Sequence, residues 1–173
     1  FTDKHTHEFQ VLSATGEDTI YHCDCGVCEW AQNKEVFLGK TGDKCPECGT
    51  CEIKESKSIE VGNIFPLGTR YSEKMNFFVT DEGGKKINPW FASYGIGPSR
   101  IVGAIVETNH DDKGIIWPES IAPFSAHLVN IGKDATSIYE QLTDAQSDIL
   151  YDDRDLSAGE KFANADLIGI PVR

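Results

Sequence analysis

The sequence has no long apolar segment. None of its hydrophobic runs approaches the roughly 20 residues that a membrane-spanning helix needs, which excludes a protein built on such helices. The chain has a single methionine and begins with Phe1. It starts in the middle of a pattern, and its last residues, Pro171 to Arg173, look like the beginning of a strand. We therefore expect a fragment that is cut at both ends.

Basic residues are scarce. The chain has 16 Lys and Arg residues against 28 Asp and Glu residues, which gives a formal net charge of -12. This balance argues against a protein coated with basic side chains that holds nucleic acid nonspecifically. A local basic site on an acidic body remains open. The acidic residues are scattered, which is typical of a solvated surface.

Cysteine is absent from the last two thirds of the chain, and all six cysteines lie between residues 23 and 51. Two Cys-x-x-Cys pairs are separated by 16 residues, a spacing that can place four thiolates around one Zn²⁺ ion. The sequence therefore predicts a structural zinc site. Its predicted ligands are Cys25, Cys28, Cys45 and Cys48.

Other interpretations of the cysteines stay open. Cys23 and Cys51 lie just outside the two pairs and are either free thiols or replacement ligands, and His22 is a weaker alternative ligand. Disulfides or six free thiols are the remaining possibility. A closed site of four thiolates has no open coordination position, so we expect the metal to hold the fold. Because this region is too short to bury much apolar surface, metal binding would supply folding energy.

The middle of the chain, residues 58–124, carries strand signals. Apolar residues crowd 59–65, and the segment Asp81–Gly84 separates two further strand-like stretches as a hairpin turn. Pro98 is placed to start a helix with an apolar stripe along residues 101–106. Gly103 inside that helix is unfavourable by propensity, so we expect close packing there.

The pattern changes after residues 114–124, which contain two prolines and indicate a linker or domain edge. A strand, a helix, a second strand and a second helix then follow in turn over residues 126–169. This alternation predicts a small parallel or mixed sheet covered by helices.

The glycine-rich stretch "SYGIGPSR", Ser93–Arg100, resembles a phosphate-binding loop. It lacks the sixth-position glycine of the dinucleotide fingerprint and the Gly-Lys-Ser/Thr ending of the P-loop. A helix start with an arginine nearby attracts phosphate oxygens, but a strand-to-helix turn without any ligand has the same pattern. Upstream, Glu60, Asn63, Thr69 and Ser72 are either the polar face of a strand or ligands for ATP, magnesium or a polar substrate.

Several long motifs together resemble one family. The stretches "HEFQVL", "IEVGNIFPLGTRYSE", "ASYGIGPSRIVGAIVE", "GIIWPESIAPF" and "LYDDRDLSAGEKFANADLIGIP" are similar, in this order, to bacterial-type prolyl-tRNA synthetases of class II. The resemblance implies an α+β and α/β fold. In this fold, residues 1–123 form part of the class II antiparallel sheet, with a zinc ribbon inserted at about residues 21–57. Residues 124–173 form a truncated α/β anticodon-binding domain.

The resemblance implies a proline–tRNA ligase that uses ATP and Mg²⁺ to form prolyl-adenylate and then charges tRNA(Pro). Such an enzyme is expected to be cytoplasmic, to be a homodimer when full length, and to need no membrane. In "SYGIGPSR", which looks like motif 3, Arg100 would be the catalytic residue that contacts ATP. The implied ATP and magnesium site consists of Glu60, Gly62, Asn63, Gly95, Gly97 and Arg100. The implied substrate residues are Ser93, at the floor of the proline pocket, and Glu8. The implied tRNA contacts are Arg154 and Lys161.

The chain also departs from the family. Asn63 and Ser93 stand where many relatives have His and Cys, so an acid–base role at position 63 is in doubt. Motifs 1 and 2 are missing, and about two dozen residues stand where many bacterial relatives carry an editing domain. We therefore expect no editing in cis and no aminoacylation by this chain alone. Two alternatives remain: a non-catalytic tRNA-binding or regulatory paralogue, and a free-standing zinc-ribbon binding module.

Overall fold

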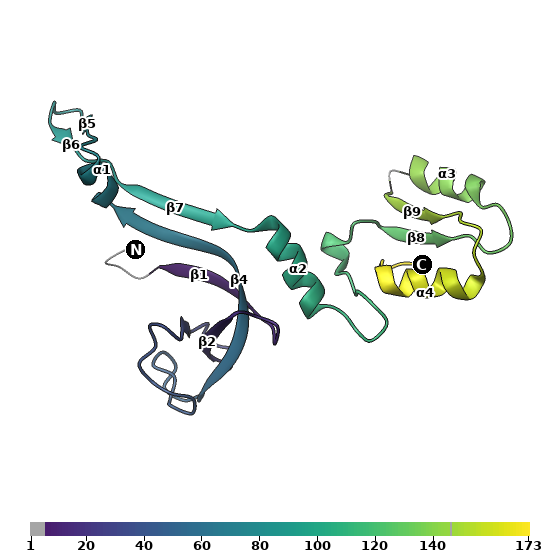
Figure 1. The fold of residues 1–173 in the computed structure, drawn as a ribbon, viewed down its shortest axis with the longest axis horizontal. Helices are drawn as coiled ribbons and strands as arrows, with labels where there is room; N and C mark the ends of the chain where they lie inside the picture. Colours follow the sequence, from purple (N-terminus) through teal and green to yellow (C-terminus); the bar gives the residue numbers. More distant parts are fainter. Residues whose placement is uncertain (1–5, 146) are drawn as a thin grey trace. The chain divides into compact units, whose positions relative to one another are not determined.

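A computed structural model of the chain describes residues 6–145 and 147–173 (Figure 1). The chain divides into two compact units, the first ending at Ala104 and the second comprising Ile105–Arg173. The division falls inside helix α2 (Pro98–Thr108). The domain boundary at residue 123/124 stays a prediction.

The first unit is a five-stranded antiparallel sheet built around the long strand β4 (Ile53–Gly68). Strands β1 (His7–Leu12), β2 (Asp18–Cys23) and β7 (Phe91–Ile96) all pair with β4, and β3 (Ala31–Asn33) pairs with β2. The predicted strand at 59–65 is therefore confirmed, but β4 is longer than the apolar run. Its polar first half is held by pairing with β2, which is a tertiary contact.

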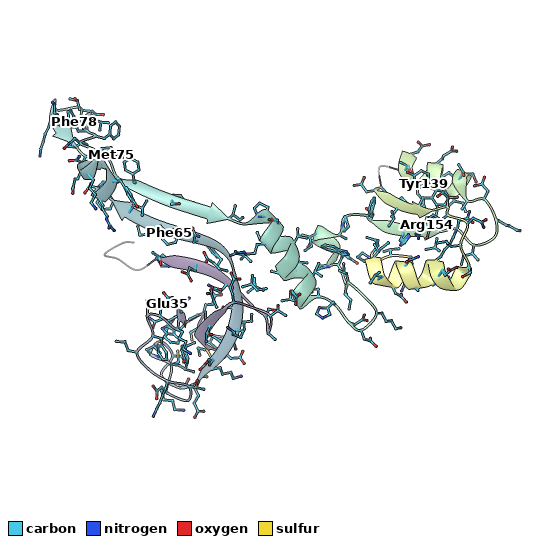
Figure 2. All side chains as sticks on the ribbon, viewed as in Figure 1. Glu35, Phe65, Met75, Phe78, Tyr139 and Arg154 are labelled. Carbon is cyan, nitrogen blue, oxygen red and sulfur yellow. The ribbon has the colours of Figure 1, made fainter. Side chains whose placement is uncertain are left out.

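A small hairpin lies beyond the far end of β4. Its elements are α1 (Arg70–Lys74), β5 (Val79–Thr80) and β6 (Lys86–Ile87). The predicted turn is confirmed: the carboxylate of Asp81 accepts the backbone N–H groups of Gly83 at 3.0 Å and Lys85 at 2.8 Å. Figure 2 shows Met75 and Phe78 at this end of the sheet, where both are exposed.

Helix α2 begins at Pro98, as predicted, because the missing N–H of proline costs nothing at a first helical position. The expectation for Gly103 is wrong. A Cβ at this position would meet no atom of the described residues within 4 Å. The glycine therefore lowers helix propensity without a packing benefit in this part of the chain.

The second unit has two parallel strands, β8 (Ala126–Val129) and β9 (Ile149–Asp152). Helix α3 (Thr136–Asp144) packs beside β9, and α4 (Ala158–Ile168) beside β8 (Figure 1). The predicted alternation and the parallel sheet are confirmed. None of the helices in the two described ranges is long and apolar enough to cross a membrane.

The proline-containing stretch 114–124 packs on the end of α4. The indole N–H of Trp117 donates to the carbonyl oxygen of Ile168 at 3.0 Å, and the backbone N–H of Ile115 donates to that of Leu167 at 3.2 Å. Gly169, at φ 75°, ends the helix in a left-handed conformation, and a Cβ there would overlap the Ile115 carbonyl. This stretch is thus part of the second unit, with a 3-10 turn at Glu119–Ile121.

Candidate functional site

The predicted ATP and proline residues converge on three neighbouring strands of the first unit. In the strand register, Asn63 on β4 lies opposite Glu8 on β1 and opposite Gly95 on β7. Ser93 is exposed and lies two residues before Gly95, so the two share a face of β7. Residues that are 87 positions apart in sequence, Glu8 and Gly95, are thereby placed on one row of the sheet.

A β-bulge shapes this row. Gln10 on β1 pairs with Glu60, but Phe9 pairs with Gly62, so Val61 is an extra residue on β4. A bulge shifts the alternation of side chains by one, which turns residues three apart toward the same side. The amide nitrogen of Asn63 accordingly donates to the carboxylate of Glu60 at 2.9 Å. The bulge therefore brings together two oxygen-bearing side chains that a regular strand would separate.

The glycines serve the close approach of β4 and β7. A Cβ at Gly95 would lie 2.6 Å from the side-chain oxygen of Asn63, and one at Gly62 would lie 2.9 Å from the carbonyl oxygen of Gly95. The backbone N–H of Gly97 donates to the carbonyl of Val61 at 3.0 Å. Side chains are excluded here by neighbouring protein atoms. The role of these glycines in binding ATP stays a prediction.

Arg100, in the first turn of α2, extends back to the bulge. Its guanidinium donates to the carbonyl oxygen of Glu60 at 3.1 Å and lies 3.5 Å from the carboxylate of Glu17. The arginine side chain is half exposed, and the Glu17 side chain is more exposed still. An ion pair this exposed is worth little, so the guanidinium can exchange Glu17 for another anion. No sequence motif pointed to Glu17.

Gln10 is a second residue that the sequence analysis missed. Its amide nitrogen donates to the carboxylates of Glu8 at 3.0 Å and Asp18 at 3.1 Å. Its amide oxygen is buried and has no hydrogen-bond partner among the described residues. The available signal was the spacing of Glu8 and Gln10, because residues two apart on a strand share a face.

Thr69 and Ser72 have local structural partners. The Ser72 hydroxyl is fully buried and donates to the carbonyl oxygen of Thr69 at 2.9 Å or of Pro89 at 2.8 Å. The Thr69 hydroxyl donates to Glu73 at 2.6 Å. These contacts favour the structural interpretation for both residues.

The six cysteines meet in one cluster, which we call the cysteine module, residues 21–57. The thiols form two sets of four. Within each set, all the sulfur atoms lie within 4.8 Å of one another. One set is Cys23, Cys28, Cys45 and Cys48, and the other is Cys23, Cys25, Cys48 and Cys51. The four predicted ligands all belong to the cluster, but neither set contains both Cys25 and Cys45.

Two backbone loops form the cluster. In the first, the N–H of Cys23 donates to the carbonyl of Trp30 at 2.9 Å, and the N–H of Cys28 donates to the sulfur of Cys25 at 3.2 Å. In the second, the N–H of Cys45 donates to the carbonyl of Cys51 at 2.8 Å. Each loop turns at a glycine with positive φ, 68° at Gly26 and 69° at Gly49.

The surroundings of the thiols favour thiolates at some positions. The hydroxyl of Thr50 and the backbone N–H groups of Cys51 and Thr50 lower the pKa of Cys48 to about 5. The N–H groups of Cys28 and Val27 lower the pKa of Cys25, whereas burial raises the pKa of Cys23.

His22 is engaged elsewhere, since its Nε2 lies 2.9 Å from the Ser56 hydroxyl. That contact argues against its place as a ligand. Four thiolates with N–H donors around them form a donor set that suits zinc.

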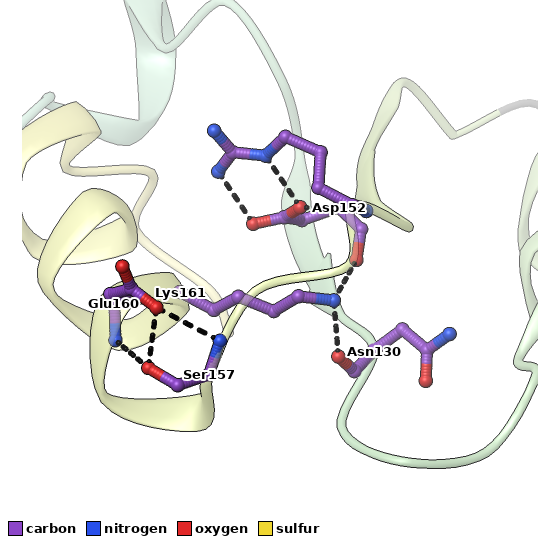
Figure 3. Close-up of polar contacts among 6 residues, drawn as sticks. Asn130, Asp152, Ser157, Glu160 and Lys161 are labelled. Carbon is purple, nitrogen blue, oxygen red and sulfur yellow. Dashed lines mark hydrogen bonds and ion pairs between the residues drawn. The ribbon is translucent and has the colours of Figure 1, made fainter.

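In the second unit, a buried polar network ties β9 to α4 (Figure 3). Asp152 is held by the guanidinium of Arg154 through two hydrogen bonds of 2.8 Å, which lower the pKa of Asp152 to about 2. Lys161 is 4% exposed, and its ammonium donates to the carbonyl oxygens of Asn130 at 2.7 Å and Asp152 at 3.2 Å. Ser157 and Glu160 form a capping box at the start of the helix.

This geometry speaks against the tRNA contact predicted for Lys161. A buried ammonium that already donates to two carbonyl oxygens is not available to an external phosphate. Lys161 is buried because the parallel pairing of β8 and β9 brings the carbonyl oxygens of Asn130 and Asp152 within reach of its ammonium group. Arg154 is half exposed beside its carboxylate partner, so its predicted contact with tRNA stays open.

Comparisons with known proteins match this architecture. Residues 120–173 match a family model described as an anticodon-binding domain. The proline–tRNA ligase of Sulfurihydrogenibium sp. (strain YO3AOP1) is 49% identical over 149 aligned positions, covering 80% of this chain and 26% of that protein. The proline–tRNA ligase of Wolbachia sp. subsp. Drosophila simulans (strain wRi) is 43% identical over 178 aligned positions, covering 96% of this chain and 42% of that protein.

Two solved structures share the fold. Prolyl-tRNA synthetase from Cryptosporidium parvum, complexed with L-proline and AMP, matches with a TM-score of 0.58 at 21% identity over 76% of this chain and 32% of that chain. The Giardia lamblia prolyl-tRNA synthetase in complex with prolyl-adenylate matches with a TM-score of 0.53 at 21% identity, over 66% of this chain and 26% of that chain. Over most of its length the chain is homologous to prolyl-tRNA synthetases, and it spans 26% and 42% of the length of the two curated relatives.

Proposed function

We propose that the chain is part of a proline–tRNA ligase, and that it supplies one wall of the ATP and proline site together with the start of the anticodon-binding domain. The observation that carries the proposal is the alignment of Glu8, Asn63 and Gly95 across three strands, with Arg100 hydrogen-bonded at the bulge beside them. Of the two solved structures with the same fold, the Giardia lamblia enzyme holds prolyl-adenylate and the Cryptosporidium parvum enzyme holds L-proline and AMP.

In this proposal the main work of the site is to position substrates and to stabilise charge. Proline activation and transfer to tRNA(Pro) are substitutions that need no protein nucleophile. Arg100 would release the exposed Glu17 and bind an ATP phosphate or the adenine face. Ser93, exposed on the same face as Gly95, would line the proline pocket.

The oxygen donors of Glu60 and Asn63 suit a hard cation. Mg²⁺ prefers carboxylate and amide oxygens, and these two side chains lie together because of the bulge. When bound, Mg²⁺ would neutralise charge on the phosphates of ATP. The residues of the chain would hold the ion and orient the phosphates beside Arg100.

The cysteine module would be a zinc-dependent structural insertion. Its core consists of Cys23, Cys45 and Ile53, and the other thiols pack against these residues. Bound zinc would crosslink two loops that have little apolar surface of their own. Because this module stands where the resemblance leads us to expect an editing domain, we propose that the enzyme has no editing activity in cis.

The test uses the full-length gene product. Proline-dependent ATP–pyrophosphate exchange and charging of tRNA(Pro) should both occur. Arg100→Ala should lower the kcat/KM for ATP by about 100-fold, because a charged group that stabilises the transition state is lost. Lys85→Ala, on the exposed hairpin, is the matched control and should leave the rate unchanged.

A different outcome would favour the alternative. The family-model match covers only residues 120–173, which is also what a non-catalytic tRNA-binding or regulatory paralogue would retain. Such a protein would bind tRNA(Pro) without any proline-dependent exchange. That result would refute the proposed ligase activity. Turnover by the 173-residue chain alone would refute our expectation that it is inactive by itself.

A further inference from the structure

The six thiols of the cysteine module form two overlapping sets rather than one site with two spare cysteines. The sets share Cys23 and Cys48, whose sulfur atoms lie 3.8 Å apart. Cys28 and Cys45 complete the first set, with 3.7 Å between their sulfur atoms. The second set is completed by the remaining two thiols, so each cysteine of the chain belongs to at least one set.

Two sulfur–sulfur separations in this arrangement suit tetrahedral zinc. A zinc–sulfur bond of about 2.3 Å in a tetrahedral site places the ligand sulfur atoms about 3.8 Å apart. The Cys23–Cys48 and Cys28–Cys45 separations match this spacing. The sulfur atoms of Cys25 and Cys28 lie 3.4 Å apart and would separate to serve different ions. Two tetrahedral sites normally need eight thiolates. Six are enough when two are shared, because a thiolate sulfur has lone pairs for two ions.

We propose that the module holds two zinc ions, one in each set, bridged by the thiolates of Cys23 and Cys48. This inference rests on the proposal that the module binds zinc at all. The terminal ligands are then Cys28 and Cys45 on one ion and Cys25 and Cys51 on the other.

The charge balance supports two ions. Six thiols release six protons when they bind two divalent cations, which leaves a net charge of -2. One ion with four thiolates has the same net charge, so the second ion adds two ligands without added charge. The Thr50 hydroxyl, 3.5 Å from the sulfur of Cys48 and 3.8 Å from that of Cys51, can donate to either sulfur. Such donors stabilise thiolates at a metal centre.

The location of the bridging pair also supports it. Cys23 is 9% exposed at the end of β2 and belongs to the buried core of the module. Burial raises the cost of a lone thiolate, and a second positive ion at the same sulfur offsets that cost. A mononuclear site made of the four predicted ligands would require the sulfur atoms of Cys25 and Cys45 to approach each other, since neither set contains both.

The experiment is a count of metal ions on the full chain under a thiol-free reductant. Native mass spectrometry after loading with Zn²⁺ should show two ions per chain. After loading with ¹¹³Cd²⁺, NMR should show two tetrathiolate resonances coupled through the shared sulfurs. All six thiols should resist iodoacetamide in the loaded protein.

Variants make the count specific. Cys51→Ser and Cys25→Ser, both at half-buried positions, should each reduce the count to one ion, whereas His22→Ala should leave it at two. One ion in the unmodified chain with two alkylatable thiols would overturn the two-ion proposal but keep the zinc proposal. No bound ion would overturn both. Two ions retained in both cysteine variants would show that the second ion is not held by these thiols.

Discussion

The cysteine module and the second unit are both small, but their cores are built differently. The core of the module is Cys23, Cys45 and Ile53, and its other close neighbours include four more thiols. In the second unit the buried residues combine Ile149 and Ala165 with a polar network. Small units bury too little apolar area to be stable by that alone. In our proposal the module therefore depends on a metal ion, whereas the second unit satisfies its buried charges with its own groups.

The difference concerns where polar groups find their partners. In the module the thiols contact one another and a few N–H groups, and in our proposal a bound cation balances the charge of their thiolates. In the second unit Asp152 has Arg154, and Lys161 has two backbone carbonyls. Each charge there is compensated when the chain folds. Three perturbations should separate the two regions.

Metal removal should have the largest effect. A strong chelator should unfold residues 21–57 and leave the second unit intact, because in our proposal only the module binds metal. Hydrogen–deuterium exchange read by mass spectrometry should show loss of protection in the module and none in β8, β9 and α4. Equal loss of protection in both regions would remove the distinction.

Lys161→Met should destabilise the second unit by about 3 kcal/mol, because two buried carbonyl groups lose a charged donor while the shape of the side chain is largely kept. The measurement is local unfolding by hydrogen exchange in urea. Lys133→Met, at an exposed position of the same unit, is the control and should change stability by less than about 0.5 kcal/mol. An effect equal to that of the control would show that the buried lysine is not needed.

Acid should weaken the second unit by a smaller amount. The pKa of Asp152 is lowered to about 2 by the hydrogen bonds from Arg154, so its contribution is complete above the ordinary value of 3.8 and is lost as the pH falls toward 2. Burial lowers the pKa of His127, which adds a loss in the same direction below pH 6.5.

Asp152→Asn should remove the lower part of this pH dependence and His127→Gln the upper part. Unfolding curves measured between pH 7 and pH 2 check both. An unchanged slope below pH 4 in Asp152→Asn would contradict the assignment.

Local features were predictable because they depend on neighbouring residues. Pro98 starts α2, Asp81 forms the predicted turn, and the apolar spacing located β8, α3, β9 and α4. Gly103 shows the limit of such reasoning, because propensity indicated a packing demand that its surroundings do not make. Lys161 shows the opposite case, since nothing in its local sequence indicated burial.

The sequence by itself determined the spacing of the cysteine pairs, the order of strands and helices in the second unit, and the start of α2 at Pro98. These follow from short-range geometry along the chain. Only the tertiary structure decided that Val61 forms a bulge, that Glu60 thereby contacts Asn63, and that Cys23 is shared between two sets of thiols. Each of these depends on how distant strands align, and strand register is set by pairing across the sheet.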